Sequence, residues 1–261
     1  MGDENVQYDD KFTKGNEVTW GEGFLAPGGA EEVCRILDGI DLVDKDVLDI
    51  GAGLGGPSFC LVEKLGAARV VGIDIEPQNI SRAEKCAAAR GLLDRVAFQC
   101  ADACDLPFAD DSFDVVFNGG GVFCETTNKT AALREVYRVL RPGGWFAAND
   151  WFHGGEPFSE EFRRWIGGDA LIGFQMITCS ELLDAMKELG FVGIMSCDRN
   201  SWYREVSRHE VERMSGPDRP RLEALLGDEG TERWIAGADL KATSVEKGDL
   251  RPHHFRGRKP Q

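Results

Sequence analysis

Apolar runs of strand length alternate with helical patterns between residues 46 and 150 of the sequence. The runs are five or six residues long and nearly unbroken, as expected for strands that a parallel sheet buries on both faces. In several segments between them, apolar residues recur every three or four positions, which predicts crossover helices. The pattern therefore predicts an α/β fold with strands at 46–50, 69–74, 95–100, 113–118 and 145–150.

Proline, glycine and the "RPGG" stretch mark the ends of these elements. Pro57 suits the first turn of a helix that runs to about Leu65, because its missing amide proton has no partner there. Gly91 follows the Ala-rich stretch from Pro77 and is placed to end that helix. "RPGG" at 141–144 follows a helical pattern and turns the chain into the fifth strand.

The flanking segments differ from this regular core. The first residues are polar, and an aromatic-rich, irregular insertion follows residue 150. A helix at 178–190 and a strand at 191–197 then restore the alternation, and an amphipathic helical region leads to "PHHFRGR", a closing antiparallel strand. We therefore divide the chain into an N-terminal lid segment at 1–31, a ligand-binding α/β core at 32–200, and a helical cap with the closing strand at 201–261.

Composition narrows the range of partners. The chain has 261 residues and a formal net charge of −15 that is spread over both halves, which argues against binding to nucleic acid or an anionic membrane. No apolar run approaches the roughly 20 residues that a membrane span needs. The acidic start is unlike a signal peptide, and the eight cysteines form no C-x-x-C pair. We expect a cytoplasmic protein, a monomer or homodimer, with reduced thiols and without a metal site.

A glycine-rich loop and an acidic residue point to a nucleoside ligand. Gly51, Gly53 and Gly56 form G-x-G-x-x-G directly after the first strand, so a ligand approaches the backbone closely there. Asp74 ends the second strand, 23 residues after Gly51, at the sheet edge where a carboxylate accepts the hydroxyl groups of a ribose. A nicotinamide cofactor and S-adenosylmethionine both satisfy this arrangement.

Further residues favour the second ligand. Asp102 follows the third strand, "LPF" and "SFDVV" lead into the fourth, and "REVYRVLRPGGWF" follows later. This ordered set resembles the class I S-adenosylmethionine-dependent methyltransferases over roughly residues 30–200. The resemblance implies a doubly wound, mostly parallel, seven-stranded Rossmann-like sheet with an N-terminal lid and helical insertions, and S-adenosylmethionine as the cofactor.

The resemblance also implies which residues hold the cofactor. The glycine loop would approach the methionyl part, two acidic strand ends would hold the ribose and the adenine, and the end of the fourth strand would lie beneath. Asp49 either touches the ligand or organises amides of the loop. The residues are Asp49, Gly51, Ala52, Gly53, Asp74, Ile75, Asp102, Ala103 and Asn118.

The N-terminal "QYDDKFTKGNEVTWGEGFLAPGG" resembles the opening of the phosphoethanolamine methyltransferases. This resemblance implies that Gln7 and Tyr8 belong to a lid over the cofactor, with Tyr8 as one half of a catalytic Tyr/His pair. Cys124 stands where that family has its histidine. The family's phosphate contacts correspond here to Asn16, Trp151, Phe174 and Gly237. A phosphate needs cationic or dense hydroxyl donors, so phosphoethanolamine is disfavoured as the substrate.

The segment "RWIAGADLK" is similar to the glycine, sarcosine and dimethylglycine methyltransferases, which act on a small amine. Aromatic side chains are consistent either with a box for an ammonium product or with ordinary packing beneath a lid. They are Trp20, Trp151, Phe152, Trp165 and Phe174.

Methyl transfer to an amine also requires removal of a proton. Tyr8 is a candidate relay, His153 just past the fifth strand is the candidate base, and Cys124 shapes the pocket. We therefore predict a small-molecule methyltransferase that forms an N-methyl or quaternary ammonium product. The alternatives are transfer to sulfur or oxygen of a small carboxylic acid such as a methylthio-hydroxy acid, an NAD-dependent oxidoreductase, and a protein that binds the cofactor without turnover.

Overall fold

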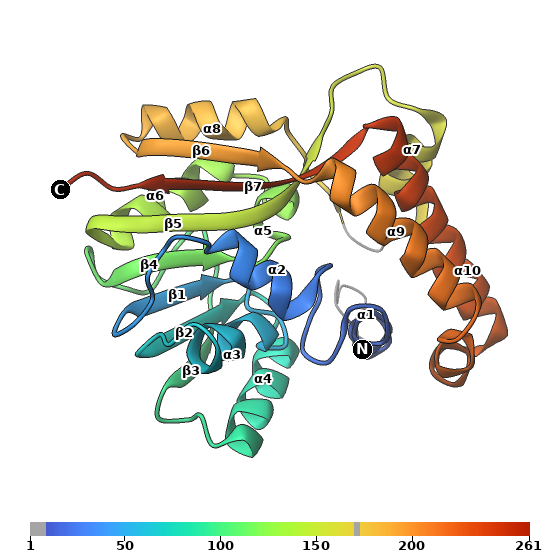
Figure 1. Ribbon diagram of the computed structural model, residues 1–261, viewed down its shortest axis with the longest axis horizontal. Helices are drawn as coiled ribbons and strands as arrows, with labels where there is room; N and C mark the ends of the chain where they lie inside the picture. The colour runs from blue at the N-terminus through green and yellow to red at the C-terminus, as the bar shows by residue number, and fades with distance from the viewer. Residues whose placement is uncertain (1–8, 170–172) are drawn as a thin grey trace, which may run out of the picture.

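A seven-stranded sheet forms the centre of the molecule (Figure 1). The computed structural model describes residues 9–169 and 173–261. The strand order is β3-β2-β1-β4-β5-β7-β6, and only β7 runs antiparallel to its neighbours. The strands are Asp46–Ile50 (β1), Arg69–Asp74 (β2), Val96–Cys100 (β3), Phe113–Asn118 (β4), Leu140–His153 (β5), Val192–Asp198 (β6) and Leu250–Arg258 (β7). The prediction of a doubly wound, mostly parallel sheet is confirmed.

Helices cover both faces of this sheet. Val47 and Leu48 are fully buried neighbours in β1, and their side chains join two different hydrophobic clusters, because successive side chains of a strand point to opposite faces. The first cluster includes residues of Gly29–Ile36 (α2), Gly56–Glu63 (α3) and Pro77–Arg90 (α4). The second includes residues of Val122–Glu125 (α5), Lys129–Val139 (α6) and Cys179–Glu188 (α8).

Local signals mark the ends of three helices, and those at Pro57 and Gly91 were predicted. Pro57 lies in the first turn of α3, and Gly91 adopts a left-handed φ of 70° at the end of α4. Thr178 caps α8 in a capping box, in which its side chain accepts from the backbone of Glu181 and the Glu181 carboxylate accepts in return. Such side-chain partners satisfy amides that a helix end leaves unpaired.

The fifth strand is longer than the pattern predicted. It starts at Leu140 rather than at Trp145, and "RPGG" lies inside it as an irregularity. Leu140 pairs with Phe113 and Trp145 pairs with Val115, so the residues between them bulge out of the ladder. The strand also extends past the predicted end at residue 150, because β7 pairs with β5 as far as His153.

The remaining helices lie beyond the carboxyl ends of the parallel strands, at the right of Figure 1. A third hydrophobic cluster ties this cap to the end of the sheet through Tyr203, Val245 and Leu250, which are all fully buried. Gly227 has non-helical angles and kinks the longest helix. These elements are Asp10–Trp20 (α1), Glu160–Arg164 (α7), the π-helix Trp165–Asp169, Asn200–Ser215 (α9) and Arg219–Lys247 (α10).

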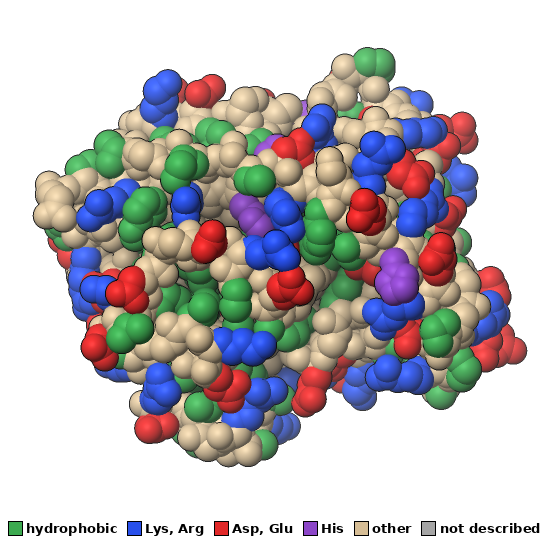
Figure 2. Space-filling view, viewed as in Figure 1, with side chains coloured by type: hydrophobic (Ala, Val, Ile, Leu, Met, Phe, Trp, Pro, Cys, Tyr) green, Lys and Arg blue, Asp and Glu red, His purple; other side chains and the backbone are tan. Residues whose placement is uncertain are grey.

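Charged side chains of both signs are interspersed over the face shown in Figure 2. Within the described residues, no helix is both long and apolar enough to cross a membrane. The same residues contain no cluster of His, Cys, Asp and Glu with the geometry of a metal site.

Candidate active site

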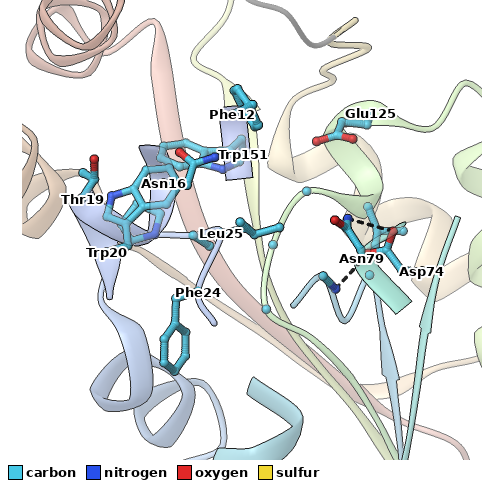
Figure 3. Close-up of a pocket in the computed structure, with 18 of the residues that line it drawn as sticks. Phe12, Asn16, Thr19, Trp20, Phe24, Leu25, Asp74, Asn79, Glu125 and Trp151 are labelled. Carbon is cyan, nitrogen blue, oxygen red and sulfur yellow. Dashed lines mark hydrogen bonds between the residues drawn. The ribbon is translucent and has the colours of Figure 1, made fainter. Parts of the chain in front are cut away.

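A cavity of about 920 Å³ opens between the carboxyl ends of the strands and the helical cap. The loops after β1, β2, β3 and β4 form one wall, and α1 and α10 contribute another. Figure 3 shows Asp74 and Asn79 on one side and Asn16, Trp20 and Trp151 on the opposite side. In open α/β sheets, ligands bind at this edge.

The glycine loop forms the floor of the cavity and leaves no room for side chains. Gly51 and Gly53 both have positive φ angles, of 70° and 54°, which side chains other than glycine rarely adopt. A Cβ on Gly51 would lie 2.6 Å from Val122, and one on Gly53 would lie 2.9 Å from Leu25. Gly51, Ala52 and Gly53 all line the cavity, as predicted.

The third glycine of the motif serves the N-terminal segment. The Gly56 N–H donates to the Gly23 carbonyl oxygen at 3.0 Å, and a Cβ on Gly56 would lie 2.5 Å from that oxygen. The motif thus leaves room beside the backbone in two places. One is at the cavity, and the other is where α3 meets the segment that follows α1.

The Asp74 carboxylate is held by three donors at the end of β2. Its Oδ2 accepts from the Gly53 N–H at 2.8 Å, and its Oδ1 accepts from the Glu76 N–H at 2.9 Å and from Asn79 Nδ2 at 3.4 Å. Burial raises the pKa of Asp74, and the two backbone donors oppose that shift. The carboxylate lines the cavity in a fixed orientation.

Asn79 was missed by the sequence analysis. It lies in the first turn of α4, is 1% exposed and lines the cavity, and its Oδ1 is buried without a partner among the described residues. The sequence signal that could have identified it was its position five residues after Asp74, in the first turn of the helix that follows this strand end.

Ile75, Asp102 and Ala103 continue the same wall and line the cavity, as predicted. Ile75 is 66% exposed, which is unusual for a large apolar side chain in a folded chain. Asp102 Oδ1 accepts from the Cys104 N–H at 2.8 Å, so a local turn orients this side chain.

Neither Asp49 nor Asn118 lines the cavity, and their predicted contacts with the cofactor stay predictions. Asp49 is fully buried, accepts from Ser58 Oγ at 2.6 Å, and has its pKa raised to about 7 by burial. Asn118 is also fully buried, and its Nδ2 donates to Asp150 Oδ2 at 3.4 Å. Asn118 Oδ1 also accepts from the Gly120 N–H and so supports the loop after β4, whereas Asp49 holds Ser58 of α3.

The expected catalytic groups do not converge. His153 lies outside the cavity, with its ring 5.2 Å from Phe158 and its buried Nδ1 without a partner among the described residues. Cys124 also lies outside the cavity, and burial raises its thiol pKa well above the usual value. His153 pairs with Leu250 of β7 at the end of β5, and the Cys124 thiol donates to the Gly121 carbonyl oxygen. Gln7 and Tyr8 lie outside the described residues.

Four of the five expected substrate aromatics line the cavity, but they make separate contacts rather than one box. Trp165 and Phe174 stack with ring centroids 4.8 Å apart and an interplanar angle of 31°. Trp151 meets Tyr203 edge-on at 4.9 Å. Phe152 is buried in the core on the other side of β5 and does not line the cavity.

A polar cluster holds Trp20 at the cavity and was also missed. Trp20 Nε1 donates to Glu210 Oε1 at 2.8 Å, and Tyr203 and Lys241 both donate to Glu210 Oε2 at 3.4 Å. Burial, followed by the charge of Glu210, raises the pKa of Tyr203 well above its usual value. Lys241 lines the cavity and lies one helical turn after Gly237, which was the available signal.

Comparison with known proteins agrees with this geometry. Residues 48–148 match a family model described as a methyltransferase domain. Phosphoethanolamine N-methyltransferase 1 of Arabidopsis thaliana is 30% identical over 212 residues, which are 81% of this chain and 42% of that protein. The chain spans about half the length of the plant relatives that it matches.

Solved structures share the fold across nearly the whole chain. Phosphoethanolamine N-methyltransferase 2 of Haemonchus contortus, in complex with phosphomonomethylethanolamine and S-adenosylhomocysteine, superposes with a TM-score of 0.90 at 23% identity over 99% of this chain and 60% of that one. A putative sarcosine dimethylglycine methyltransferase of Galdieria sulphuraria gives a TM-score of 0.79 at 20% identity over 98% and 99% of the two chains.

Proposed function

The chain belongs to the class I S-adenosylmethionine-dependent methyltransferases, and we propose that it transfers the cofactor's methyl group to a nitrogen atom of a small amine or amino acid. The observation that carries the proposal is the wall of the cavity where the Asp74 carboxylate, fixed by three donors, adjoins a glycine loop without side chains. That wall fits a nucleoside with free ribose hydroxyl groups.

The chain's residues divide the cofactor among them. Gly51, Ala52 and Gly53 would hold the methionyl part, Asp74 and Ile75 would hold the ribose, and the adjoining Asp102 and Ala103 would hold the adenine; all seven residues line the cavity. S-adenosylmethionine supplies an electrophilic methyl group on a sulfonium. The cap over the cavity excludes water and aligns the acceptor with that methyl group.

The lack of a histidine at the cavity, among the described residues, favours a second candidate. No histidine lines the cavity within 9–169 and 173–261, and an ammonium acceptor must lose a proton before it can react. A thioether or a carboxylate needs no base, so transfer to sulfur or oxygen of a small carboxylic acid is the alternative.

Mass spectrometry tests both. A mixture of small amines, amino acids and thioether acids is incubated with the protein and with cofactor that carries a deuterated methyl group. We expect one class of compound to gain the labelled methyl as S-adenosylhomocysteine accumulates. Consumption of added NAD without labelling would identify an oxidoreductase. Binding of the cofactor without methyl transfer to any compound would indicate a protein that binds the cofactor without turnover.

A further inference from the structure

The cavity contains a lysine ammonium that already occupies aromatic faces. Lys241 Nζ lies 4.9 Å from the ring centroid of Trp20 and 5.6 Å from that of Tyr203. Glu210 is 4% exposed and holds this ammonium at 3.4 Å. The lysine side chain is 12% exposed, so the arrangement lies mostly inside the protein. Its charge is therefore only partly screened by water.

This arrangement removes Trp20 from the expected ammonium box. A cation gains from an aromatic face within about 6 Å of the ring centroid, and Lys241 already provides that contact to Trp20 and Tyr203. A second cation at this wall would face a like charge in a poorly solvated cavity, which is unfavourable.

The two helices that carry Lys241 and Trp20 also provide open space and a side-chain amide at the cavity. A Cβ on Gly237, one turn before Lys241 on α10, would meet no atom within 4 Å, so the helix surface is open there. Asn16, one turn before Trp20 on α1, lines the cavity and is 4% exposed. Its side chain makes no hydrogen bond to another described residue. Figure 3 shows it beside the Trp20 wall.

Other charged residues lie elsewhere around the cavity. Arg233 is exposed on α10 two turns before Lys241 and makes no ion pair with a described residue. Asp9 caps α1 by accepting from the Phe12 N–H at 2.7 Å. Glu125 lies on the opposite side of Figure 3 from Trp20. The charges at the Trp20 wall itself are the Lys241 ammonium and the Glu210 carboxylate that pairs with it.

We propose that Lys241 selects the charge of the methyl acceptor: its ammonium and the Asn16 amide bind an anionic oxygen group of the acceptor, and the same ammonium rejects an acceptor that is only cationic. The proposal rests on the proposed methyltransferase function and names its substrate class, a small nucleophile that carries a carboxylate or a phosphate. Because Glu210 already compensates part of the ammonium charge, a singly charged carboxylate fits this site better than a doubly charged phosphate.

Calorimetry on the protein saturated with S-adenosylhomocysteine tests this selection with three probes that share a small amine. N-methylglycine adds a carboxylate, phosphoethanolamine adds a phosphate, and N-methylethanolamine adds no anion. We expect wild type to bind N-methylglycine most tightly and N-methylethanolamine least. Lys241→Met should weaken binding of the two anionic probes about tenfold or more, since a charge-assisted contact is lost, and should not weaken binding of the cation.

Variants on the same helix and in the same cluster control for indirect effects. Lys247→Met removes an ammonium that pairs with Glu161 outside the cavity and should change no probe. Lys241→Arg should retain the preference for anions. If Lys241→Met unfolds because Glu210 loses its cation, the double variant Lys241→Met, Glu210→Gln removes both charges together and is tested in its place.

Three outcomes would overturn the selection by Lys241: wild type binds the cation as tightly as the anions, neither anionic probe binds, or Lys241→Met weakens all three probes equally. Tighter binding of phosphoethanolamine than of N-methylglycine would retain the anion site but assign it to phosphate. Failure of S-adenosylhomocysteine to bind in the first titration would instead contradict the proposed function.

Discussion

Asp74 is the residue on which recognition of the cofactor depends most. Its two oxygens are already oriented by Gly53, Glu76 and Asn79, so little reorganisation is needed when a ligand arrives. Preorganised charged acceptors lose less conformational freedom on binding and therefore bind more tightly.

Replacing Asp74 by alanine should lower affinity for S-adenosylhomocysteine about 100-fold or more, because two charge-assisted hydrogen bonds to the ribose are lost. Titration calorimetry measures this, and circular dichroism should show an intact fold. Asp94→Ala, which removes an exposed carboxylate outside the cavity, serves as the matched control. Unchanged affinity of the Asp74 variant would refute the ribose contact.

Asn79→Leu should separate cofactor affinity from stability. The substitution keeps the size of the side chain, removes the contact to Asp74 and removes a buried, unpartnered oxygen. We expect affinity for S-adenosylhomocysteine to fall about tenfold while the free energy of unfolding stays equal or rises. Calorimetry and urea unfolding measure the two quantities. A parallel fall of both would make Asn79 a purely structural residue.

Residues at strand ends were predictable, whereas residues on the cap helices were not. The sequence placed Asp74 and Asp102 correctly at the cavity, because parallel strands end at a common edge. It could not place Glu210 or Lys241, because the direction of a helical side chain depends on how the helix packs. It misplaced His153, because β5 extends to this residue and pairs there with Leu250 of β7, a partner far along the chain.

At the scale of elements, α1 is fastened to two separate parts of the molecule. Arg82 of α4 donates to Thr13 Oγ1 at 2.5 Å and to Glu17 Oε2 at 2.8 Å. Arg213 of α9 donates to the carbonyl oxygens of Val18 and Thr19, at 3.3 and 3.2 Å. The helix thus joins the sheet domain to the cap, next to the contact between Gly23 and Gly56.

Gly56→Ala should loosen this N-terminal segment. Its Cβ would lie 2.5 Å from the Gly23 carbonyl oxygen, so the backbone has to move apart. Hydrogen exchange in α1 should become faster, and affinity for S-adenosylhomocysteine should fall. Gly173→Ala, where a Cβ meets nothing within 4 Å, is the control. Unchanged exchange in α1 would contradict the role given to this glycine.

The regular elements follow from the sequence, and their irregularities do not. Strands buried on both faces and capped helices leave local signals, so α3, α4 and α8 were placed within a few residues. The bulge in β5 depends on the register with β4, which is a long-range property. The kink at Gly227 likewise has no local signal beyond the glycine itself.

At the scale of the whole molecule, Asp49 links stability to pH. Its folded pKa of about 7 exceeds the usual value of 3.8 because the carboxyl is buried. Between these values the folded chain holds a proton that the unfolded chain has released, so Asp49 makes stability fall as the pH rises through this window.

Between pH 5 and pH 8, the free energy of unfolding of Asp49→Asn should therefore fall by about 2 kcal/mol less than that of wild type. The asparagine can still accept from Ser58 Oγ. Urea unfolding at several pH values measures the difference, and all other titrating groups are common to both proteins. Parallel pH profiles would show that the carboxyl is not buried in this way.

The fold and the cavity together assign a nucleoside cofactor to the edge where the parallel strands end. The most direct test is titration of the wild-type protein with S-adenosylhomocysteine and, separately, with NAD. The account predicts that S-adenosylhomocysteine binds at a single site and that NAD does not bind. Binding of NAD with no heat from S-adenosylhomocysteine would contradict it.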